Sequence, residues 1–221
     1  MATARARRSY EQFCPIARSL DVLGERWTLL VVRELMLGPR RYTDLKSALP
    51  GMWSNLLARR LRDLESAGVV RRCELPPPAA RTVYELTERG RALGPVLHEI
   101  ARWGIPYLDA PTTEQPLLEH LLPEGVRALV MLEHLPTHPL VVLLETDVGP
   151  FTVDIGVDDG PLLDRVRVLS VSAEAPDVVV RGSVVEALAV RRGDIALTET
   201  NLSFEGDPDA VAAVQRLFGF R

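Results

Sequence analysis

Polar side chains that can bond to nucleic-acid bases recur at helical spacing after residue 54. Asn55, Arg59 and Arg62 stand three or four positions apart, so that in a helix they share one face. In the major groove of DNA, arginine can donate two hydrogen bonds to guanine, and asparagine can form two with adenine. The spacing therefore indicates base recognition, although the same arginines taken alone could simply solvate a surface helix. Another face of this helix carries an apolar stripe, formed by Leu57, Leu61 and Leu64.

Further positions around this helix are placed to contact a DNA duplex. Trp53 and Ser54 stand at the predicted N-terminus of the helix, where free N–H groups favour phosphate, and Ser54 is expected to cap it. Thr43 is expected to cap a short preceding helix from Asp44 to Leu49. Arg81 stands at the tip of a predicted β-ribbon and suits a phosphate or the narrow minor groove. We therefore expect DNA contacts from Thr43, Trp53, Ser54, Asn55, Arg59, Arg62 and Arg81.

These side chains need a scaffold, and the sequence predicts its elements in a suitable order. The segment from Trp27 to Leu37 is apolar nearly all round and is expected to be a buried helix. The Pro50-Gly51 turn separates the two helices that follow it, and Gly68 ends the second. Thr87 is expected to cap one longer helix that reaches Trp103. Two strands, Val69–Leu75 and Thr82–Leu86, flank a proline-rich tip. This order predicts a winged helix-turn-helix, whose second paired helix enters the major groove.

Charge is distributed unevenly along the chain. Residues 1–110 contain 18 Lys and Arg against 12 Asp and Glu, a net charge of +6, whereas residues 111–221 contain 8 against 18, a net charge of −10. The basic half suits a polyanion, and the acidic half should repel one. The role of Arg60 stays open, because it could face solvent or pair with Asp63 or Glu65.

The sequence favours a reducing compartment and gives no sign of a membrane. Its two cysteines, Cys14 and Cys73, are too few for a disulfide framework or a zinc cluster. No apolar run reaches the length that spans a bilayer, and residues 1–8 lack the apolar core of a secretion signal. We expect a cytoplasmic protein without a membrane partner, in which Cys73 is structural.

The acidic half predicts an α+β domain after a linker rich in proline and threonine. Residues Pro116 to about Leu135 are expected to be helical with an interruption at Pro123, and Leu202–Phe204 stays unassigned. Strands are expected at Pro139–Glu145, 151–157, Arg165–Ser172 and Asp177–Val180, and helices at Ser183–Val190 and Pro208–Phe218. The α+β chain is thus expected to comprise a flexible arm (1–12), a winged domain (13–108), a linker (109–116) and a second domain (117–221).

Several motifs of the first half resemble HxlR-type regulators of the MarR-like superfamily. They cover about residues 13–104 in the correct order: 13–16, 23–30, 41–45, 61–68 and 84–90. This sequence departs from the family at Met52-Trp53, where smaller residues are common. The resemblance implies that Cys14 holds the position of a redox-sensing thiol in some members, with an inert buried thiol as the alternative.

The HxlR resemblance also implies a homodimer that binds an inverted repeat near a promoter. The dimer would be built from the first helix and the helix that ends at Trp103. Packing within one protomer is the alternative for the apolar stripe of the latter helix. The implied interface residues are Ile16, Leu20, Leu93, Val96, Leu97, Ile100 and Trp103.

The second half resembles a sterol-carrier-protein-like domain over about residues 117–220. The resemblance rests on Pro176 to Gly182 and Leu202 to Pro208, each followed by a helix. It implies a five-stranded sheet with helices over it and an apolar tunnel for a small molecule. Candidate lining residues, each of which could instead belong to the core, are Val130, Met131, His134, Phe151 and Val153.

Motifs of catalysis and of cofactor binding are absent from the sequence. It contains no Gly-x-Ser-x-Gly, phosphate-binding glycine loop or dinucleotide fingerprint. Pro136 separates His134 from His138 and would break a helical metal pair, so that we expect no metal even with His120 and Glu133 nearby. The favoured hypothesis is a non-enzymatic DNA-binding regulator, modulated by an apolar small molecule. The alternative is an enzyme or a lipid carrier that uses the winged domain only for assembly and binds DNA weakly and without salt dependence.

Overall fold

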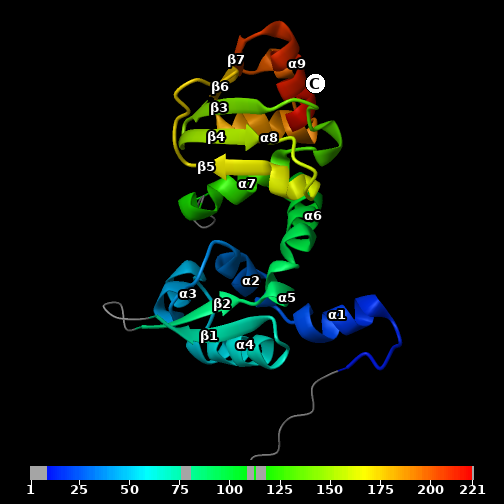
Figure 1. Cartoon of the computed structure of the whole chain (residues 1–221), viewed down its shortest axis with the longest axis vertical. Coiled ribbons are helices and arrows are strands. Elements are labelled where there is room, and N and C mark those ends of the chain that lie inside the picture. Colours follow the sequence, from blue (N-terminus) through cyan, green and yellow to red (C-terminus); the bar gives the residue numbers. More distant parts are fainter. Residues whose placement is uncertain (1–8, 76–80, 109–111, 113–117, 221) are drawn as a thin grey trace, which may run out of the picture. The chain divides into compact units, whose positions relative to one another are not determined.

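The computed structural model describes residues 9–75, 81–108, 112 and 118–220. The expected tip of the ribbon at 76–80, the expected linker apart from Thr112, and residues 1–8 of the expected arm lie outside these residues. The chain forms two compact units, Met1–Leu97 and His98–Arg221, and the division falls within one helix (Figure 1).

The N-terminal unit has the winged helix-turn-helix architecture that the sequence predicts. Its ribbon is antiparallel, with Val70 opposite Leu86 and Glu74 opposite Thr82. Figure 1 shows α1 projecting to one side of the other helices and the ribbon. In chain order the elements are α1 (Pro15–Leu23), α2 (Thr28–Met36), α3 (Tyr42–Ala48), α4 (Ser54–Ser66), β1 (Val70–Glu74), β2 (Thr82–Leu86), α5 (Glu88–Arg91) and the first part of α6 (Gly94–Gly104).

Helix α2 is buried as expected, but it also brings a carboxylate into the core. The side chain of Glu34 is 0% exposed, and its carboxylate lies 2.8 Å from Nη2 of Arg33 and 3.7 Å from Nη2 of Arg40. Nε of Arg40 donates to the backbone carbonyl of Glu34 at 3.0 Å. Arg40 and Tyr84 also exchange two backbone hydrogen bonds, of 3.0 and 2.8 Å. Arg40 therefore ties the end of α2 to strand β2, and the expectation of an almost wholly apolar α2 is corrected at Glu34.

The predicted cap of α3 is wrong by two residues and that of α4 by one. Helix α3 begins at Tyr42 with Arg41 as its N-cap residue, because the Asp44 carboxylate accepts from the Arg41 backbone N–H at 3.2 Å and from its guanidinium at 2.8 and 2.7 Å. Thr43 lies inside the first turn. Helix α4 begins at Ser54, and the N-cap position is taken by Trp53, which makes no side-chain cap. The ion pair between Arg41 and Asp44 sets the start of α3, and the preceding turn sets the start of α4. A capping hydroxyl sets neither.

The single long helix predicted after Thr87 is two helices. Thr87 does cap α5, since its hydroxyl accepts from the Gly90 N–H at 3.1 Å. The same hydroxyl donates to the Gly68 carbonyl at 2.6 Å, which holds the start of α5 against the start of the ribbon. Helix α5 ends at Arg91, and α6 starts at Gly94. A Cβ atom on Gly90 would lie 2.2 Å from the Val69 carbonyl oxygen, so only glycine allows this close approach.

The C-terminal unit is a five-stranded mixed sheet with helices packed against it. The sheet order is β5-β4-β3-β6-β7, in which only the β3–β6 pair is parallel. Its helices and strands are the rest of α6, α7 (Leu122–Leu129), β3 (Leu140–Thr146), β4 (Gly149–Ile155), β5 (Val166–Leu169), β6 (Val178–Gly182), α8 (Val184–Arg192), β7 (Ser203–Gly206) and α9 (Pro208–Phe218). Short 3₁₀ turns lie at Ile105–Tyr107, Glu119–Leu121, Leu132–His134, Leu162–Arg165 and Leu197–Glu199.

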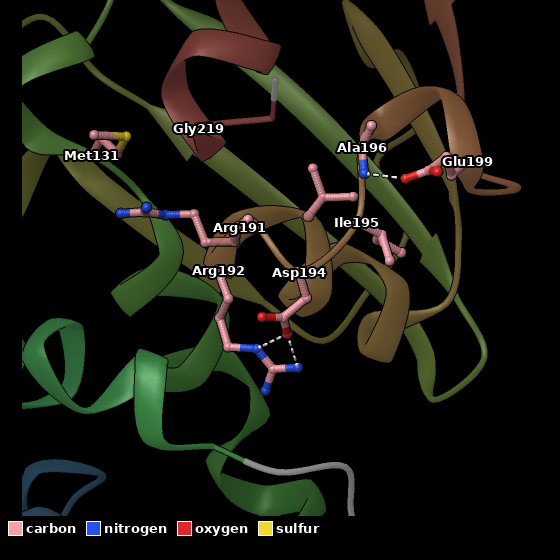
Figure 2. Close-up of a pocket in the computed structure, with 10 residues that line it drawn as sticks. Met131, Arg191, Arg192, Asp194, Ile195, Ala196, Glu199 and Gly219 are labelled. Carbon is pink, nitrogen blue, oxygen red and sulfur yellow. Dashed lines mark hydrogen bonds and ion pairs between the residues drawn. The ribbon is translucent and has the colours of Figure 1, made fainter.

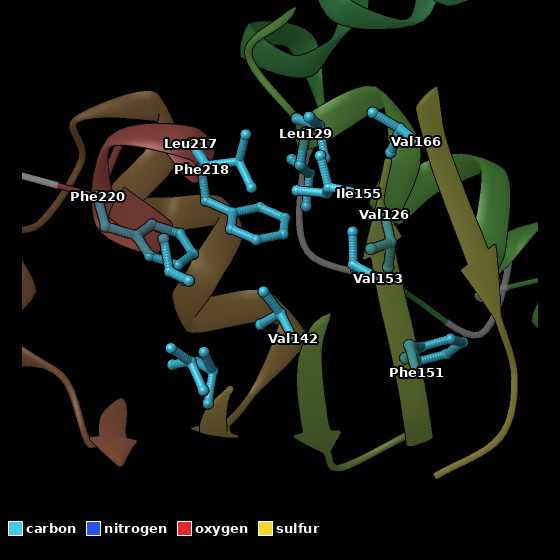
Figure 3. Packing of buried hydrophobic residues seen from close by; sticks show 14 of the residues in the cluster. Val126, Leu129, Val142, Phe151, Val153, Ile155, Val166, Leu217, Phe218 and Phe220 are labelled. Atoms are coloured by element: carbon cyan, nitrogen blue, oxygen red, sulfur yellow. The ribbon is translucent and has the colours of Figure 1, made fainter. Parts of the chain in front are cut away.

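One face of this sheet builds the core. Because side chains alternate along a strand, the register aligns Val168, Val153, Val142 and Val178 in one row across four strands. Helices α7, α8 and α9 supply the facing apolar residues, including Val126, Leu129, Val190, Leu217 and Phe218. Figure 3 shows Leu217 and Phe218 directed toward the sheet residues Val142, Val153 and Ile155. The other face carries polar residues together with apolar ones such as the buried Leu143.

Ion pairs occupy that other face. Arg181 of β6 bonds Glu145 of β3 at 2.6 Å and Glu205 of β7 at 2.7 Å, and Arg167 of β5 bonds Asp154 of β4. These exposed pairs join neighbouring strands, and each contributes only modestly to stability in water. The sheet therefore has one apolar face and one face on which exposed ion pairs and buried side chains such as Leu143 occur together.

Several boundaries in this half differ from those expected. The helix predicted from Pro116 to Leu135 is reduced to α7 and flanking 3₁₀ turns, and its first residues lie outside the described part of the chain. Pro123 lies in the first turn of α7, where its missing N–H is not needed, so it is not an interruption. The unassigned segment 202–204 contributes to β7, and the last helix has the predicted bounds. None of the helices in the described ranges is both long enough and apolar enough to cross a bilayer.

We predict that Gly90→Ala destabilises the N-terminal unit. The added methyl group would collide with the Val69 carbonyl, and strain of this kind costs about 1–3 kcal/mol. Gly94→Ala is the matched control, since a Cβ atom at Gly94 meets nothing within 4 Å. Urea denaturation followed by circular dichroism measures both free energies of unfolding. Equal effects of the two substitutions would contradict the proposed close approach.

Candidate nucleic-acid interface

Helix α4 presents its polar residues to solvent and its leucines to the core. Asn55, Arg59 and Arg62 are exposed, whereas Leu57, Leu61 and Leu64 are at most 1% exposed. Nε of Arg59 lies 3.8 Å from Oδ2 of Asp63, a loose contact between two half-exposed side chains. Arg62 has no ion-pair partner among the residues that the structure describes. Two guanidinium groups and an amide are therefore available to an incoming ligand on one face.

Two hydrogen bonds from α3 fix the turn that precedes α4. The Tyr42 hydroxyl donates to the Ser54 carbonyl at 2.6 Å, and Nζ of Lys46 donates to the Met52 carbonyl at 2.6 Å. Met52 is fully buried between these two points. The sequence does not reveal these roles of Tyr42 and Lys46, because their acceptors are backbone carbonyls that no motif identifies. These bonds hold the start of α4 in one orientation.

Trp53 stands on this fixed turn with its indole in solvent. It is 78% exposed, and its backbone carbonyl accepts from the N–H groups of Leu56 and Leu57, both at 3.0 Å. Because an indole cannot accept a hydrogen bond from the helix, the chain forgoes a capping side chain here. Serine, threonine, asparagine or aspartate at this position typically adds about 0.5–2 kcal/mol of stability relative to alanine.

Arg60 does not face solvent with its neighbours. Its side chain is 7% exposed, and its guanidinium donates to Asp63 and to Glu25, both at 2.9 Å. Of the partners left open by the sequence, Asp63 is confirmed and Glu65 gives way to Glu25, which lies 35 residues away in the loop after α1. One feature of the sequence indicates that Arg60 is buried, because it follows Leu57 by three positions and so borders the leucine stripe. Arg60 thereby joins the α1–α2 loop to α4.

The ribbon carries further exposed arginines. Arg81 is exposed beside the tip, and its carbonyl accepts from the Leu75 N–H at 2.8 Å. Arg71 pairs with Glu85 at 2.5 Å. The Cys73 thiol donates to the same carboxylate at 3.2 Å, and this bond, together with burial, raises the pKa of Cys73. A raised pKa makes Cys73 a poor nucleophile near neutral pH.

The expected dimer residues are only partly covered within one chain. Ile16 and Leu20 on α1, together with Val96, Ile100 and Trp103 on α6, are exposed. Leu93 and Leu97 are half-buried against the core of the N-terminal unit, as the alternative of packing within one protomer requires. Cys14 is half-buried at the N-cap position of α1, and its carbonyl accepts from the Arg18 N–H at 2.9 Å.

The candidate ligand residues of the C-terminal unit are scattered. Val130, Phe151 and Val153 belong to the core cluster. His134 is exposed, and its Nδ1 lies 2.9 Å from the Arg216 carbonyl oxygen. Met131 is half-buried and lines an open pocket of about 540 Å³. Only Met131 among the five borders this pocket, which is lined by Met131, Val190, Arg191, Arg192, Gly193, Asp194, Ile195, Ala196, Glu199 and Gly219.

Figure 2 shows this pocket with Met131 and the Arg191 guanidinium on one side and Ile195, Ala196 and Glu199 on the other. Two of its acids are already engaged. The guanidinium of Arg192 bonds Asp194 at 2.6 Å, and Glu199 accepts from the Ala196 N–H at 2.7 Å. The pocket thus combines apolar side chains with charged ones. Within the described ranges, no three His, Cys, Asp or Glu residues converge as metal ligands.

Comparison with known proteins relates the N-terminal unit to transcription regulators. Residues 22–112 match the family model described as HxlR-like helix-turn-helix. The chain is 37% identical over 99 residues to the HTH-type transcriptional regulator YvaP of Bacillus subtilis, a match that covers 44% of this chain and 92% of YvaP. It is 41% identical over 105 residues to the HTH-type transcriptional regulator sll1512 of Synechocystis sp., which covers 48% of this chain and 78% of that protein.

A solved structure is also similar in sequence. The reduced form of the transcriptional regulator YodB from B. subtilis is 34% identical, and the match covers 44% of this chain and 97% of YodB, with a TM-score of 0.39.

We predict that Arg60→Met destabilises the protein while Arg62→Met does not. The first substitution removes two charge-assisted hydrogen bonds from a buried guanidinium, which costs about 1–3 kcal/mol once the solvent exposure of Glu25 and Asp63 is allowed for. The second removes an exposed charge and should change the free energy of unfolding by less than about 0.5 kcal/mol. Thermal and urea denaturation of both variants measure the difference. Similar losses in both would contradict the structural role of Arg60.

Proposed function

Because the chain belongs to the HxlR-like helix-turn-helix family, we propose that it regulates transcription by binding duplex DNA with α4 in the major groove. The observation that carries the proposal is the rotation of α4, which turns Asn55, Arg59 and Arg62 away from the buried leucines. The net charge of +6 over residues 1–110, from 18 basic and 12 acidic residues, favours a polyanion. We place this activity in the cytoplasm and assign it no catalytic step.

In this proposal each DNA-facing residue has a distinct role. Arg59, Arg62 and Asn55 bond base edges, while the exposed Thr43, Ser54 and Arg81 contact the backbone or the minor groove. Trp53 lies beside Ser54 at the N-terminal end of α4. Phosphate contacts set the register of the protein on the duplex, and base contacts set the preferred sequence.

We further propose that the active species is a homodimer on an inverted repeat. The exposed apolar side chains of α1 and α6, Ile16, Leu20, Val96, Ile100 and Trp103, would be withdrawn from water by the partner. Leu93 and Leu97 would border this interface from their half-buried positions. A two-fold dimer places two recognition helices about one turn of DNA apart, which matches an inverted repeat.

We predict that Arg59→Ala relaxes sequence preference whereas Arg81→Ala weakens binding to every sequence. Loss of a bidentate guanine contact should reduce the affinity ratio between preferred and unrelated DNA by about 5- to 150-fold. Loss of a phosphate contact should instead lower the slope of log K against log salt by about 1. Fluorescence anisotropy at several salt concentrations measures both quantities, with the exposed Arg216→Ala on α9 as control. Weak, salt-insensitive binding by the wild type would favour an enzyme or carrier that uses the winged domain only for assembly.

We also propose that a small, largely apolar molecule bound in the C-terminal unit modulates DNA binding. A five-stranded sheet with helices against one face is compatible with the sterol-carrier-like resemblance of this half. The pocket beside Met131 has a volume of about 540 Å³, which is within the usual range of about 300–1,000 Å³ for ligand sites. Its charged rim would anchor a polar end of the effector. Regulation requires that the effector bind one arrangement of the dimer more tightly than another.

We predict that Ala196→Trp removes a bound effector whereas Ala175→Trp does not. Ala196 is exposed and lines the pocket, so an indole there would fill it, while Ala175 is exposed but does not line the pocket. Native mass spectrometry of the purified full chain should detect a non-covalent adduct in the wild type and in Ala175→Trp only. Absence of an adduct from the wild type, or its retention in Ala196→Trp, would contradict this site.

A further inference from the structure

Trp53 is unfavourable for the folded chain in two ways: it does not cap α4, and its indole is exposed. The N-cap residue of a helix is usually serine, threonine, asparagine or aspartate, whose oxygen accepts from a free N–H, and Trp53 makes no such bond. Its indole is also 78% exposed to water. A single exposed apolar side chain is ordinary on a protein surface. An exposed indole that also displaces a capping group is not explained by folding and points to a contact made outside the chain.

The backbone around Trp53 is held on both sides. Lys46 bonds the carbonyl of the preceding residue, Tyr42 bonds the carbonyl of the following one, and the Trp53 carbonyl itself is engaged by two N–H groups of α4. The starting point of the side chain is therefore fixed before any partner arrives. A preorganised aromatic group loses little conformational entropy on binding, which favours its use as a contact.

The chemistry around Trp53 identifies the kind of partner. Asn55 and Arg59 follow it on α4, and the exposed cations Arg59 and Arg62 select a polyanion. These polar residues account for hydrogen-bonding base edges and phosphates. The face of an indole can do neither, but it can pack on an apolar group. Among the groups that base pairs present in the major groove, the C5-methyl of thymine is the apolar one.

We infer that Trp53 is a specificity-determining residue that packs on the C5-methyl group of a thymine in each half of the operator. The inference rests on the proposed function, because it requires α4 to lie in the major groove. It adds one base, with its chemical group, to a site at which Asn55 and the arginines read purines. Contact with a deoxyribose ring of the backbone is the competing arrangement, and it would carry no dependence on the methyl group.

The test uses the full chain and removes one methyl group at a time. Bound duplexes are first selected from fragmented genomic DNA, and each thymine of the selected site is then replaced by deoxyuridine, which leaves every hydrogen-bonding group in place. We expect one thymine in each half-site at which the wild type loses about three- to tenfold in affinity, the effect of one buried methyl group. Trp53→Ser should bind the thymine operator more weakly and should not distinguish thymine from deoxyuridine there. Trp53→Phe, which keeps an apolar face, should retain part of the discrimination.

A second readout separates this role from a structural one. Serine can cap α4, so Trp53→Ser should raise Tm by roughly 2–8 °C while it weakens DNA binding. Trp53→Ser with lowered Tm would assign Trp53 to folding and overturn the inference.

The outcomes also separate the inference from the proposed function. If no duplex is selected, the proposed function fails first. If duplexes are selected but deoxyuridine has no effect on the wild type at any thymine, the regulator stands and the thymine contact is refuted. If Trp53→Ser weakens binding to the thymine operator more than to the deoxyuridine operator, so that the variant binds both with equal affinity while the wild type discriminates between them, the inference is supported. If Trp53→Ser still discriminates as the wild type does, another residue reads the methyl group.

Discussion

Three leucines of α4, Leu57, Leu61 and Leu64, are removed from water by the core of the N-terminal unit. Burial of one such side chain stabilises the fold by about 1.5–3 kcal/mol, and a single good base contact supplies about 1–3 kcal/mol of discrimination. A rotation of α4 that exposed all three leucines would therefore cost about 4.5–9 kcal/mol, more than any single base contact could return. Burial of the leucines therefore keeps Arg59 and Arg62 exposed. On binding, DNA must adapt to the orientation of α4, because α4 does not rotate to fit the DNA.

The same separation of faces organises the C-terminal unit on a larger scale. Alternation along β4 sends Phe151, Val153 and Ile155 into the core, while Asp154 meets Arg167 on the other face. Close packing of α9 over the apolar rows leaves the described open pocket at the ends of α8 and α9, lined by Arg191 and Gly219 rather than by the middle of the sheet. A molecule bound there would meet helix termini and loops, which are less constrained than strands that are paired on both sides.

Sequence reasoning succeeded where the deciding interactions are local and failed where they cross the chain. The local pattern predicts the strand Thr82–Leu86 after a proline-rich segment, and apolar residues at helical spacing predict the helix Pro208–Phe218; both have the expected bounds. The starts of α3 and α4 were misplaced because a salt bridge and backbone hydrogen bonds replace the expected hydroxyl caps. The break between α5 and α6 was missed although Gly94-Pro95 marks it locally, because Pro95 has no N–H to bond the carbonyl of Arg91 four residues earlier. For the candidate interface, helical spacing predicted the outward side chains of α4. It could not predict that Arg60 reaches Glu25, because no local pattern encodes a partner 35 residues distant.

Arg40 shows how the direction of the ribbon is decided. Its guanidinium is anchored to Glu34 of α2, and its backbone pairs with Tyr84 on β2, so the base of the wing is fastened to the most buried helix of the unit. The orientation of the hairpin therefore does not depend on its tip. The sequence of the tip can consequently change by insertion, deletion or exchange of its cationic residues while the two strands keep their orientation. Evolution can thus exchange what the wing touches without having to redesign the body that holds it.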